Sequence, residues 1–197
     1  VDEHEYWACL TAVKMQDRLA ELREKWQSEG DRWPEIVHNM QNRIGINTGK
    51  LVTGNMGSTM RMNYTMMGDT VNLAARLEAS AKQYGVYIQV AEETYKACKD
   101  KFIWRDLDYV IVMGKTEPAQ VFELISEKGN MPKGYNKLLP AYDEALKLYR
   151  NQEWEKAIDA FKAKGGKFKR HQERGANGTE WRYRTILIQL SNEDDYE

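Results

Sequence analysis

Two polar residues that could act on one ligand, Asn72 and Arg76, lie four positions apart in a segment whose apolar spacing predicts a helix over 69–82. Residues at this spacing share a helix face, so the amide and the guanidinium can reach the same bound molecule. The guanidinium is always cationic and has several donors, which suits an anionic ligand. The competing interpretation is a solvated helix face, the usual role of an isolated Asn/Arg pair.

The elements that would position this pair alternate between helices and strands. A stripe of apolar residues predicts an amphipathic helix over 5–26, which Pro34 prevents from continuing. Strands are expected at 43–47 and 51–53, around a turn at Thr48 and Gly49, and also at 62–67, 87–90, 102–112 and 119–125, with a short helix at 92–99. This order predicts an α/β domain over residues 1–126.

Local signals around the predicted helix have structural explanations. Asp69 is expected to cap the start of the helix. The glycines at 45, 49, 54 and 57 do not have the spacing of a phosphate-binding loop, so we attribute them to tight turns and close approach between strands.

The composition changes after Ser126. A linker rich in helix breakers is expected at 127–134, followed by a helical tail over 135–197 whose Trp154, Ala157 and Phe161 have tetratricopeptide-like spacing. The segment 162–184 is rich in Lys and Arg and is expected to be a basic loop, and the chain closes with an acidic end. We interpret the tail as a contact for a protein partner or as an extension that stabilises a dimer.

Charge and cysteine content exclude several classes of protein. The 29 basic and 30 acidic side chains give a net charge of −1, so neither nucleic acid nor an anionic membrane is an expected partner. No apolar stretch approaches the roughly 20 residues that span a bilayer, and the first residues do not have the layout expected of a signal peptide. The two cysteines, Cys9 and Cys98, are far apart in sequence, which favours a reducing, cytoplasmic location, whether or not a longer parent protein is membrane-anchored.

The block 43–78 closely resembles the catalytic domain of class III nucleotidyl cyclases, the adenylyl and guanylyl cyclases. The likeness is carried by R-I-G-I-N-T-G at 43–49, Y-T-x-x-G-D-x-V-N-L-A-x-R at 64–76 and G-K-x-E-P at 114–118. It extends over about residues 1–126. The resemblance implies the ferredoxin-like α/β (α+β) cyclase fold with its N-terminal part missing, followed here by an α-helical hairpin.

The resemblance also implies a reaction and a role for each site residue. In this family the ribose 3′-hydroxyl of a nucleoside triphosphate attacks its own α-phosphate and expels pyrophosphate. Arg76 would stabilise charge on the phosphoryl oxygens, and Asn72 would orient the ribose. Thr65 would read the purine and favour ATP, because its hydroxyl can accept from the adenine amine. A β-branched residue that simply fills a strand is the alternative for Thr65.

Two departures from the family bear on activity. The family binds two Mg²⁺ or Mn²⁺ ions through two aspartates, which we expect upstream of Val1, so no metal ligand is assigned in this chain. Met113 stands where the family commonly has a triphosphate-binding lysine, and Lys115 is a candidate for part of that contact. A thioether cannot replace an ammonium as a partner of phosphate.

These departures leave two functions open. The first is an adenylate cyclase, present as a fragment that is inactive alone and works at the interface of a homodimer or with a second cyclase domain. The second is a catalytically silent cyclase-like module that binds nucleotide or regulates another protein.

Overall fold

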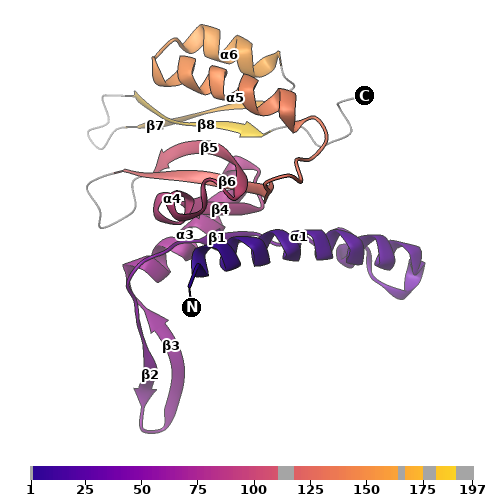
Figure 1. The fold of residues 1–197 in the computed structure, drawn as a ribbon, viewed down its shortest axis with the longest axis vertical. Coiled ribbons are helices and arrows are strands. Elements are labelled where there is room, and N and C mark those ends of the chain that lie inside the picture. Colours follow the sequence, from indigo (N-terminus) through magenta and orange to yellow (C-terminus); the bar gives the residue numbers. More distant parts are fainter. Residues whose placement is uncertain (1, 111–117, 164–166, 175–180, 190–197) are drawn as a thin grey trace. The chain divides into compact units, whose positions relative to one another are not determined.

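The structure of the chain is a computed structural model that describes residues 2–110, 118–163, 167–174 and 181–189 (Figure 1). It divides into two compact units, Val1–Lys82 with Val86–Gly129, and Gln83–Gly85 with Asn130–Glu197. The domain bounds 1–126, 127–134 and 135–197 stay predictions.

The first unit is built on a four-stranded sheet in the order β1-β4-β6-β5. Its strands are β1 (Ile44–Ile46), β4 (Ile88–Ala91), β6 (Ala119–Glu127) and β5 (Phe102–Val110). The pair β1 and β4 is parallel, whereas β4 with β6 and β5 with β6 are antiparallel. Together with the helices, this sheet gives the mixed α+β architecture that the sequence predicts.

Helices cover the two faces of this sheet. On β1, Ile44 and Ile46 pack against the core formed with α1 (His4–Ser28), while Gly45 between them lies against α3 (Asp69–Tyr84). Successive residues of a strand point to opposite faces, so α1 and α3 lie on opposite sides of the sheet. The short helix α4 (Glu92–Cys98) adds Cys98 to the core on the α1 side.

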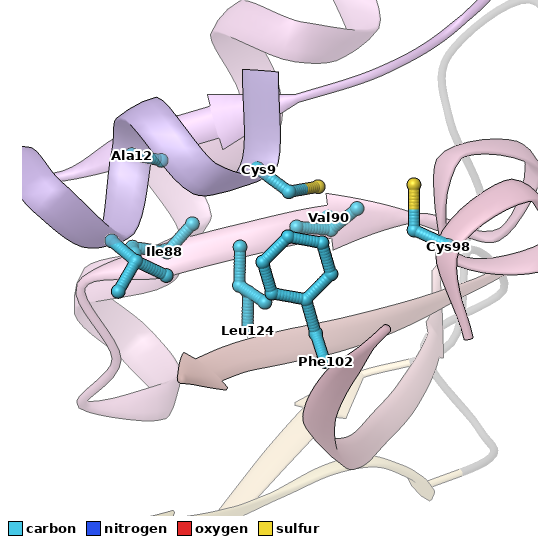
Figure 2. Packing of buried hydrophobic residues seen from close by; sticks show 8 residues of the cluster. Cys9, Ala12, Ile88, Val90, Cys98, Phe102 and Leu124 are labelled. Atoms are coloured by element: carbon cyan, nitrogen blue, oxygen red, sulfur yellow. The ribbon is translucent and has the colours of Figure 1, made fainter. Parts of the chain in front are cut away.

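The core between α1 and the sheet is apolar and closely packed. Figure 2 shows Cys9 and Ala12 of α1 above Ile88, Val90 and Leu124 of the sheet, with Phe102 and Cys98 beside them. These side chains come from five separate elements, and at about 25 cal/mol per Å² their burial is the main force holding the elements together.

The strands β2 (Val52–Ser58) and β3 (Arg61–Met67) form a separate antiparallel hairpin, which extends away from the four-stranded sheet (Figure 1). The segments predicted at 43–47 and 51–53 therefore belong to different sheets rather than to one pair of strands around a turn. Every residue of β3 is exposed. The hairpin thus leaves both its faces available for contact with other molecules.

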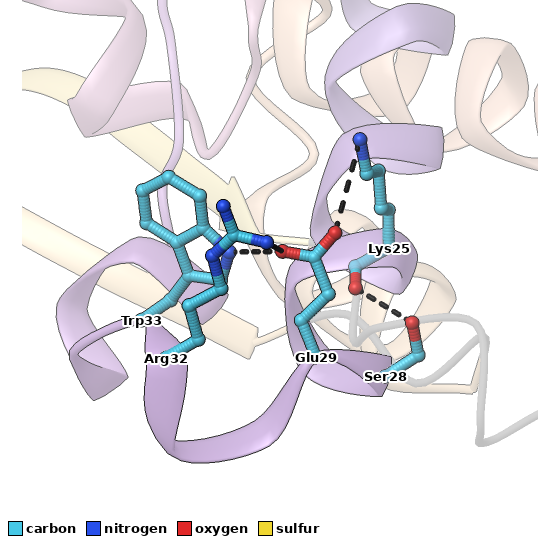
Figure 3. A network of polar contacts seen from close by, with 5 residues as sticks. All are labelled: Lys25, Ser28, Glu29, Arg32 and Trp33. Atoms are coloured by element: carbon cyan, nitrogen blue, oxygen red, sulfur yellow. Dashed lines mark hydrogen bonds and ion pairs between the residues drawn. The ribbon is translucent and has the colours of Figure 1, made fainter.

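The segment after α1 contains two short helices that the sequence did not predict, the 3₁₀ helix η1 (Gly30–Arg32) and α2 (Glu35–His38). A polar network joins the end of α1 to η1 and to Trp33, which follows it, as Figure 3 shows. Glu29 accepts a hydrogen bond from Trp33 Nε1 and lies near Lys25 and Arg32, and Ser28 donates to the carbonyl of Lys25. This network fixes the C-terminal end of α1.

The second unit contains the predicted helical hairpin, formed by α5 (Tyr135–Arg150) and α6 (Trp154–Lys162). Its core consists of buried apolar side chains: Tyr142, Ala145, Leu146, Ala157 and Phe161. Tyr149 and Trp154 meet edge to face across the connection, with ring centroids 5.2 Å apart.

The prediction of a basic loop at 162–184 is wrong for most of that segment. Residues Lys167–Arg174 form β7, and they pair antiparallel with β8 (Trp181–Gln189). The many charges and glycines of this segment favour a loop. The run W-R-Y-R-T-I-L-I-Q, however, is rich in aromatic and β-branched residues, which favour strands. The tail is therefore not wholly helical.

The remaining elements of the first unit agree with the sequence prediction to within a few residues, except that β2 continues to Ser58 rather than ending at 53. In the part of the chain that the structure describes, none of the helices has the length and apolar character needed to cross a membrane.

Candidate functional site

The pair Asn72 and Arg76 lies on α3, and both side chains are exposed. The neighbouring residues Leu73 and Leu77 are buried, with Leu77 only 1% exposed and close to Gly45 of β1. Because α3 buries that side, the amide and the guanidinium are presented on the other side, one helical turn apart. The structure thus places together the two residues that the sequence singled out.

The start of α3 differs by one residue from the prediction. Asp69 is the first residue of the helix and not the residue before it. The carbonyl of Gly68 accepts hydrogen bonds from the backbone N–H groups of Val71 and Asn72, both at 3.1 Å. Gly68 therefore occupies the capping position, and the carboxylate of Asp69 instead complements the positive end of the helix dipole.

Gly45 holds α3 close to the sheet. A Cβ atom at this position would lie 2.1 Å from the carbonyl oxygen of Ala74 and 2.5 Å from the backbone nitrogen of Glu78. Both are backbone atoms of the helix, so any larger residue would push α3 away from β1. The prediction that this glycine serves close approach between strands is wrong, because its close neighbour is a helix.

Thr65 lies in β3, opposite Gly54 of β2 in the antiparallel register. Its side chain is exposed, so it does not fill a core, and its hydroxyl is accessible to a ligand. Gly68 alone separates the end of β3 from the start of α3. The candidate base reader therefore lies at the end of the hairpin that leads directly into the helix of the candidate ribose and phosphate contacts.

Lys115 and Met113 lie outside the described residues. Among the residues that the structure describes, no group of three or more His, Cys, Asp or Glu side chains is placed to hold a metal ion. The described carboxylates therefore do not fit a two-metal site, which needs several carboxylate oxygens converging on ions about 4 Å apart.

Sequence reasoning missed the role of Asn47. Its side chain reaches from the end of β1 to the first turn of α3, where Nδ2 donates a hydrogen bond to the carbonyl of Thr70 at 3.0 Å. The signal was available, since Asn47 lies within R-I-G-I-N-T-G, but a contact between residues 23 positions apart cannot be read from a local pattern.

Comparison with known proteins finds similar sequences and similar structures. Residues 1–125 match the family model described as the adenylate and guanylate cyclase catalytic domain. The terminal-differentiation specific adenylate cyclase of Dictyostelium discoideum is 33% identical over 156 residues, which cover 77% of this chain. Adenylate cyclase 1 of Rhizobium meliloti (strain 1021) is 33% identical over 122 residues, or 62% of this chain.

The solved structure of the guanylyl cyclase Cya2 is also similar, with a TM-score of 0.52 and 26% sequence identity over 66% of this chain and 62% of that one. Adenylate and guanylate cyclases thus both occur among the similar proteins. The matched regions are only 7% of the Dictyostelium relative and 17% of the Rhizobium relative.

Proposed function

Since the chain belongs to the family of adenylate and guanylate cyclase catalytic domains, we propose that it contributes Asn72 and Arg76 to an adenylate cyclase site. The reaction converts ATP to cyclic AMP and pyrophosphate. The observation that carries this proposal is the exposed Asn72 and Arg76 pair on one helix, within the motif that the family shares.

The two side chains have different tasks in this reaction. The 3′-hydroxyl gives its proton to water and its oxygen forms a bond to the α-phosphorus, while the bond from that phosphorus to the pyrophosphate oxygen breaks and pyrophosphate leaves. Arg76 donates hydrogen bonds to the phosphoryl oxygens, whose negative charge is rearranged in the transition state. Asn72 hydrogen-bonds the ribose and holds the hydroxyl in line with the leaving group.

Thr65 supports ATP as the substrate. Its exposed hydroxyl can accept a hydrogen bond from the exocyclic amine of adenine. Because guanylyl cyclases occur among the similar proteins, the choice of ATP over GTP rests on this residue.

We propose that the site is completed by a second cyclase domain, from another copy of a longer parent protein or from a different protein. The hairpin of β2 and β3 supports this, because it exposes large apolar side chains: Val52, Met60, Met62, Tyr64, Met66 and Met67. Scattered apolar residues are normal on a surface, but a cluster this dense on one hairpin is typical of a contact with another protein.

We propose that the reaction also uses divalent ions, Mg²⁺ or Mn²⁺, and that carboxylates outside the described residues bind these ions. Since the described side chains do not form such a site, no step of the reaction is assigned to a metal ion bound by them. We propose that the chain makes no cyclic AMP without a partner that supplies these carboxylates.

Complementation tests this division of labour. The partner is a cyclase domain of the family that keeps its metal-binding aspartates and carries Ala at the positions matching Asn72 and Arg76. Neither protein alone should form cyclic AMP from ATP with Mg²⁺ or Mn²⁺, whereas the mixture should. Arg76→Ala in this chain should then reduce turnover by about 100-fold or more.

The matched control is Arg18→Ala, which removes an exposed helical arginine paired with Glu21 on α1. It should leave turnover of the mixture unchanged. Formation of the mixed dimer is measured for each variant by size-exclusion chromatography with light scattering. Turnover by the chain alone would contradict the proposed division of labour, and an Arg76→Ala mixture as active as the wild type would contradict the role of Arg76.

A second candidate function is a catalytically silent module, which Met113 favours because it replaces an expected phosphate-binding lysine. Met113→Lys in the same mixture discriminates between the two. If the mixture is inactive before and after this change, although the mixed dimer forms, the regulatory function is supported. For the tail, we propose either a contact with a protein partner or an extension that stabilises the dimer. Weaker dimer formation without residues 135–197 would support the second, and unchanged dimer formation would favour the first.

A further inference from the structure

The segment that leaves β1 contacts α3 at three alternate residues. Gly45 lies against Ala74 and Glu78, Asn47 reaches Thr70, and a Cβ atom at Gly49 would lie 2.6 Å from the hydroxyl oxygen of Thr70. These contacts show that all three residues face the same helix. The contacts at 47 and 49 both converge on the first turn of α3.

Of these contacts, only Asn47 supplies a directed polar bond. Its Nδ2 donates to the carbonyl of Thr70 at 3.0 Å, and the Asn47 side chain is partly buried. A hydrogen bond of this kind constrains both the distance and the direction of the helix turn that accepts it. The glycines permit close approach, whereas Asn47 fixes where along its axis the turn sits.

The first turn of α3 carries Asn72 two residues after Thr70. The backbone N–H of Asn72 donates to Gly68 within the same turn. A shift of the Thr70 carbonyl would therefore move the backbone from which the Asn72 side chain projects. Small displacements of this kind are costly, because a misplacement of about 1 Å can reduce turnover by about 100-fold.

We propose that Asn47 is a positioning residue for the cyclase reaction, acting through Thr70 to set the place of Asn72. This inference rests on the proposed function for its effect on turnover. It makes no claim that Asn47 touches the nucleotide. The rival account is that Asn47 only satisfies a polar group and stabilises the fold.

The matched variants are Asn47→Ala and Gln16→Ala. Gln16 on α1 makes the same kind of bond, with Nε2 donating to the carbonyl of Asn42 at 3.0 Å, but it does not hold α3. In the complementation mixture, Asn47→Ala should lower kcat about tenfold and change KM for ATP less than threefold. Gln16→Ala should change neither.

A double-mutant cycle separates positioning from general stability. If Asn47 acts through Asn72, then Asn47→Ala should cause little further loss of turnover in an Asn72→Ala background. The proposal would be overturned if Asn47→Ala lowered turnover by the same factor in the wild-type and Asn72→Ala backgrounds. It would also be overturned if Gln16→Ala lowered turnover as much as Asn47→Ala. Asn47→Ser, which keeps a donor, should lose less than Asn47→Ala and serves as a second variant if the latter does not fold.

Hydrogen exchange gives a readout that does not need turnover. Asn47→Ala should speed exchange of the amides of residues 71–74 and leave those of the buried strand β4 unchanged. Gln16→Ala should leave exchange unchanged in both segments. If the wild-type mixture makes no cyclic AMP although the dimer forms, the proposed function fails, and this comparison alone decides the positioning role. Unchanged hydrogen exchange at residues 71–74 in Asn47→Ala would overturn the positioning role of Asn47.

Discussion

Arg105 on β5 and Glu123 on β6 face each other across the antiparallel register, with Nε of the guanidinium 2.7 Å from the carboxylate Oε2. The Arg105 side chain is 2% exposed and that of Glu123 is 13% exposed. A buried ion pair of this kind contributes little net free energy to folding, even with good geometry. The cost of removing both charges from water offsets most of their attraction.

Removal of one partner of this pair should destabilise the protein much more than removal of both. Glu123→Ala should lower the free energy of unfolding by about 3 kcal/mol, because Arg105 stays buried without this carboxylate. The double variant Arg105→Met with Glu123→Leu should recover most of that loss. Urea unfolding followed by circular dichroism measures both.

The control for this prediction is Glu93→Ala, which removes an exposed carboxylate that pairs with Lys96 on α4. It should change the free energy of unfolding by less than about 0.5 kcal/mol. A loss for Glu123→Ala no larger than that of the control would contradict the view that the buried pair is tightly coupled.

Thr65 should set the preference between nucleotides. In the complementation mixture, Thr65→Cys should lower the ratio of kcat/KM for ATP to that for GTP by about tenfold, because a thiol is a poor acceptor for the adenine amine. Thr53→Cys on the adjacent strand is the matched control. The Thr53 hydroxyl is hydrogen-bonded to the hydroxyl of Tyr64, which lies on the opposite face of the hairpin from Thr65. Replacement of Thr53 should therefore leave the preference for ATP over GTP unchanged. Equal effects of both variants would exclude base readout by Thr65.

The carboxylate of Glu29 should titrate below the usual range. The hydrogen bond from Trp33 is the main cause that lowers the pKa of Glu29, and Arg32 and Lys25 add to it. A lowered pKa in the folded state stabilises the protein above the pKa of the unfolded carboxyl, and this contribution is lost as the pH falls through the lowered value.

Trp33→Phe tests that cause, because it keeps the ring but removes the donor. The pKa of Glu29, followed by the NMR shift of its side-chain carboxyl carbon, should rise toward the ordinary value. Trp26→Phe is the control, since Trp26 packs near Trp33 without bonding Glu29. An unchanged pKa in Trp33→Phe would show that Arg32 and Lys25, and not the indole, lower it.

Cys9 and Cys98 should be slow to react in the folded protein. Burial raises the pKa of both thiols, so little reactive thiolate forms near neutral pH. At pH 8, iodoacetamide should modify them at least about tenfold more slowly than an exposed thiol, and unfolding in urea should abolish the difference. Ser28→Cys, at an exposed position of α1, provides the reference thiol. Rapid modification of the native cysteines would mean that the α1 side of the core opens readily.

The same raised pKa has a consequence for stability. The contribution of the buried thiols is fully present below the pKa of an ordinary cysteine. It is lost as the pH rises toward the higher pKa of the folded state, because only the unfolded chain ionises readily in that window.

Local patterns in the sequence were sufficient for most elements of the first unit and for the pair on α3. Apolar spacing predicted a helix over 5–26, and the structure has one at His4–Ser28. The four-residue spacing of Asn72 and Arg76 placed both on one side of a helix, because the geometry of a helix depends only on its own residues. The family motifs then indicated what chemistry the pair could serve.

The sequence did not determine which segments lie together. The strand over 44–46 pairs with Ile88–Ala91 and not with the segment that follows it, and Lys167–Arg174 pairs with Trp181–Gln189 despite its many charges. Such pairings depend on which side chains, far apart in the sequence, can be buried together. The spacing of apolar residues within one segment does not contain that information.

The same limit applies to the site. The sequence by itself determined that Asn72 and Arg76 share a helix. Only the tertiary structure decided that Gly45 brings this helix against the sheet and that Asn47 bonds its first turn. The physical reason is that helix formation is governed by neighbouring residues, whereas the placement of a helix is governed by contacts between residues far apart in the chain.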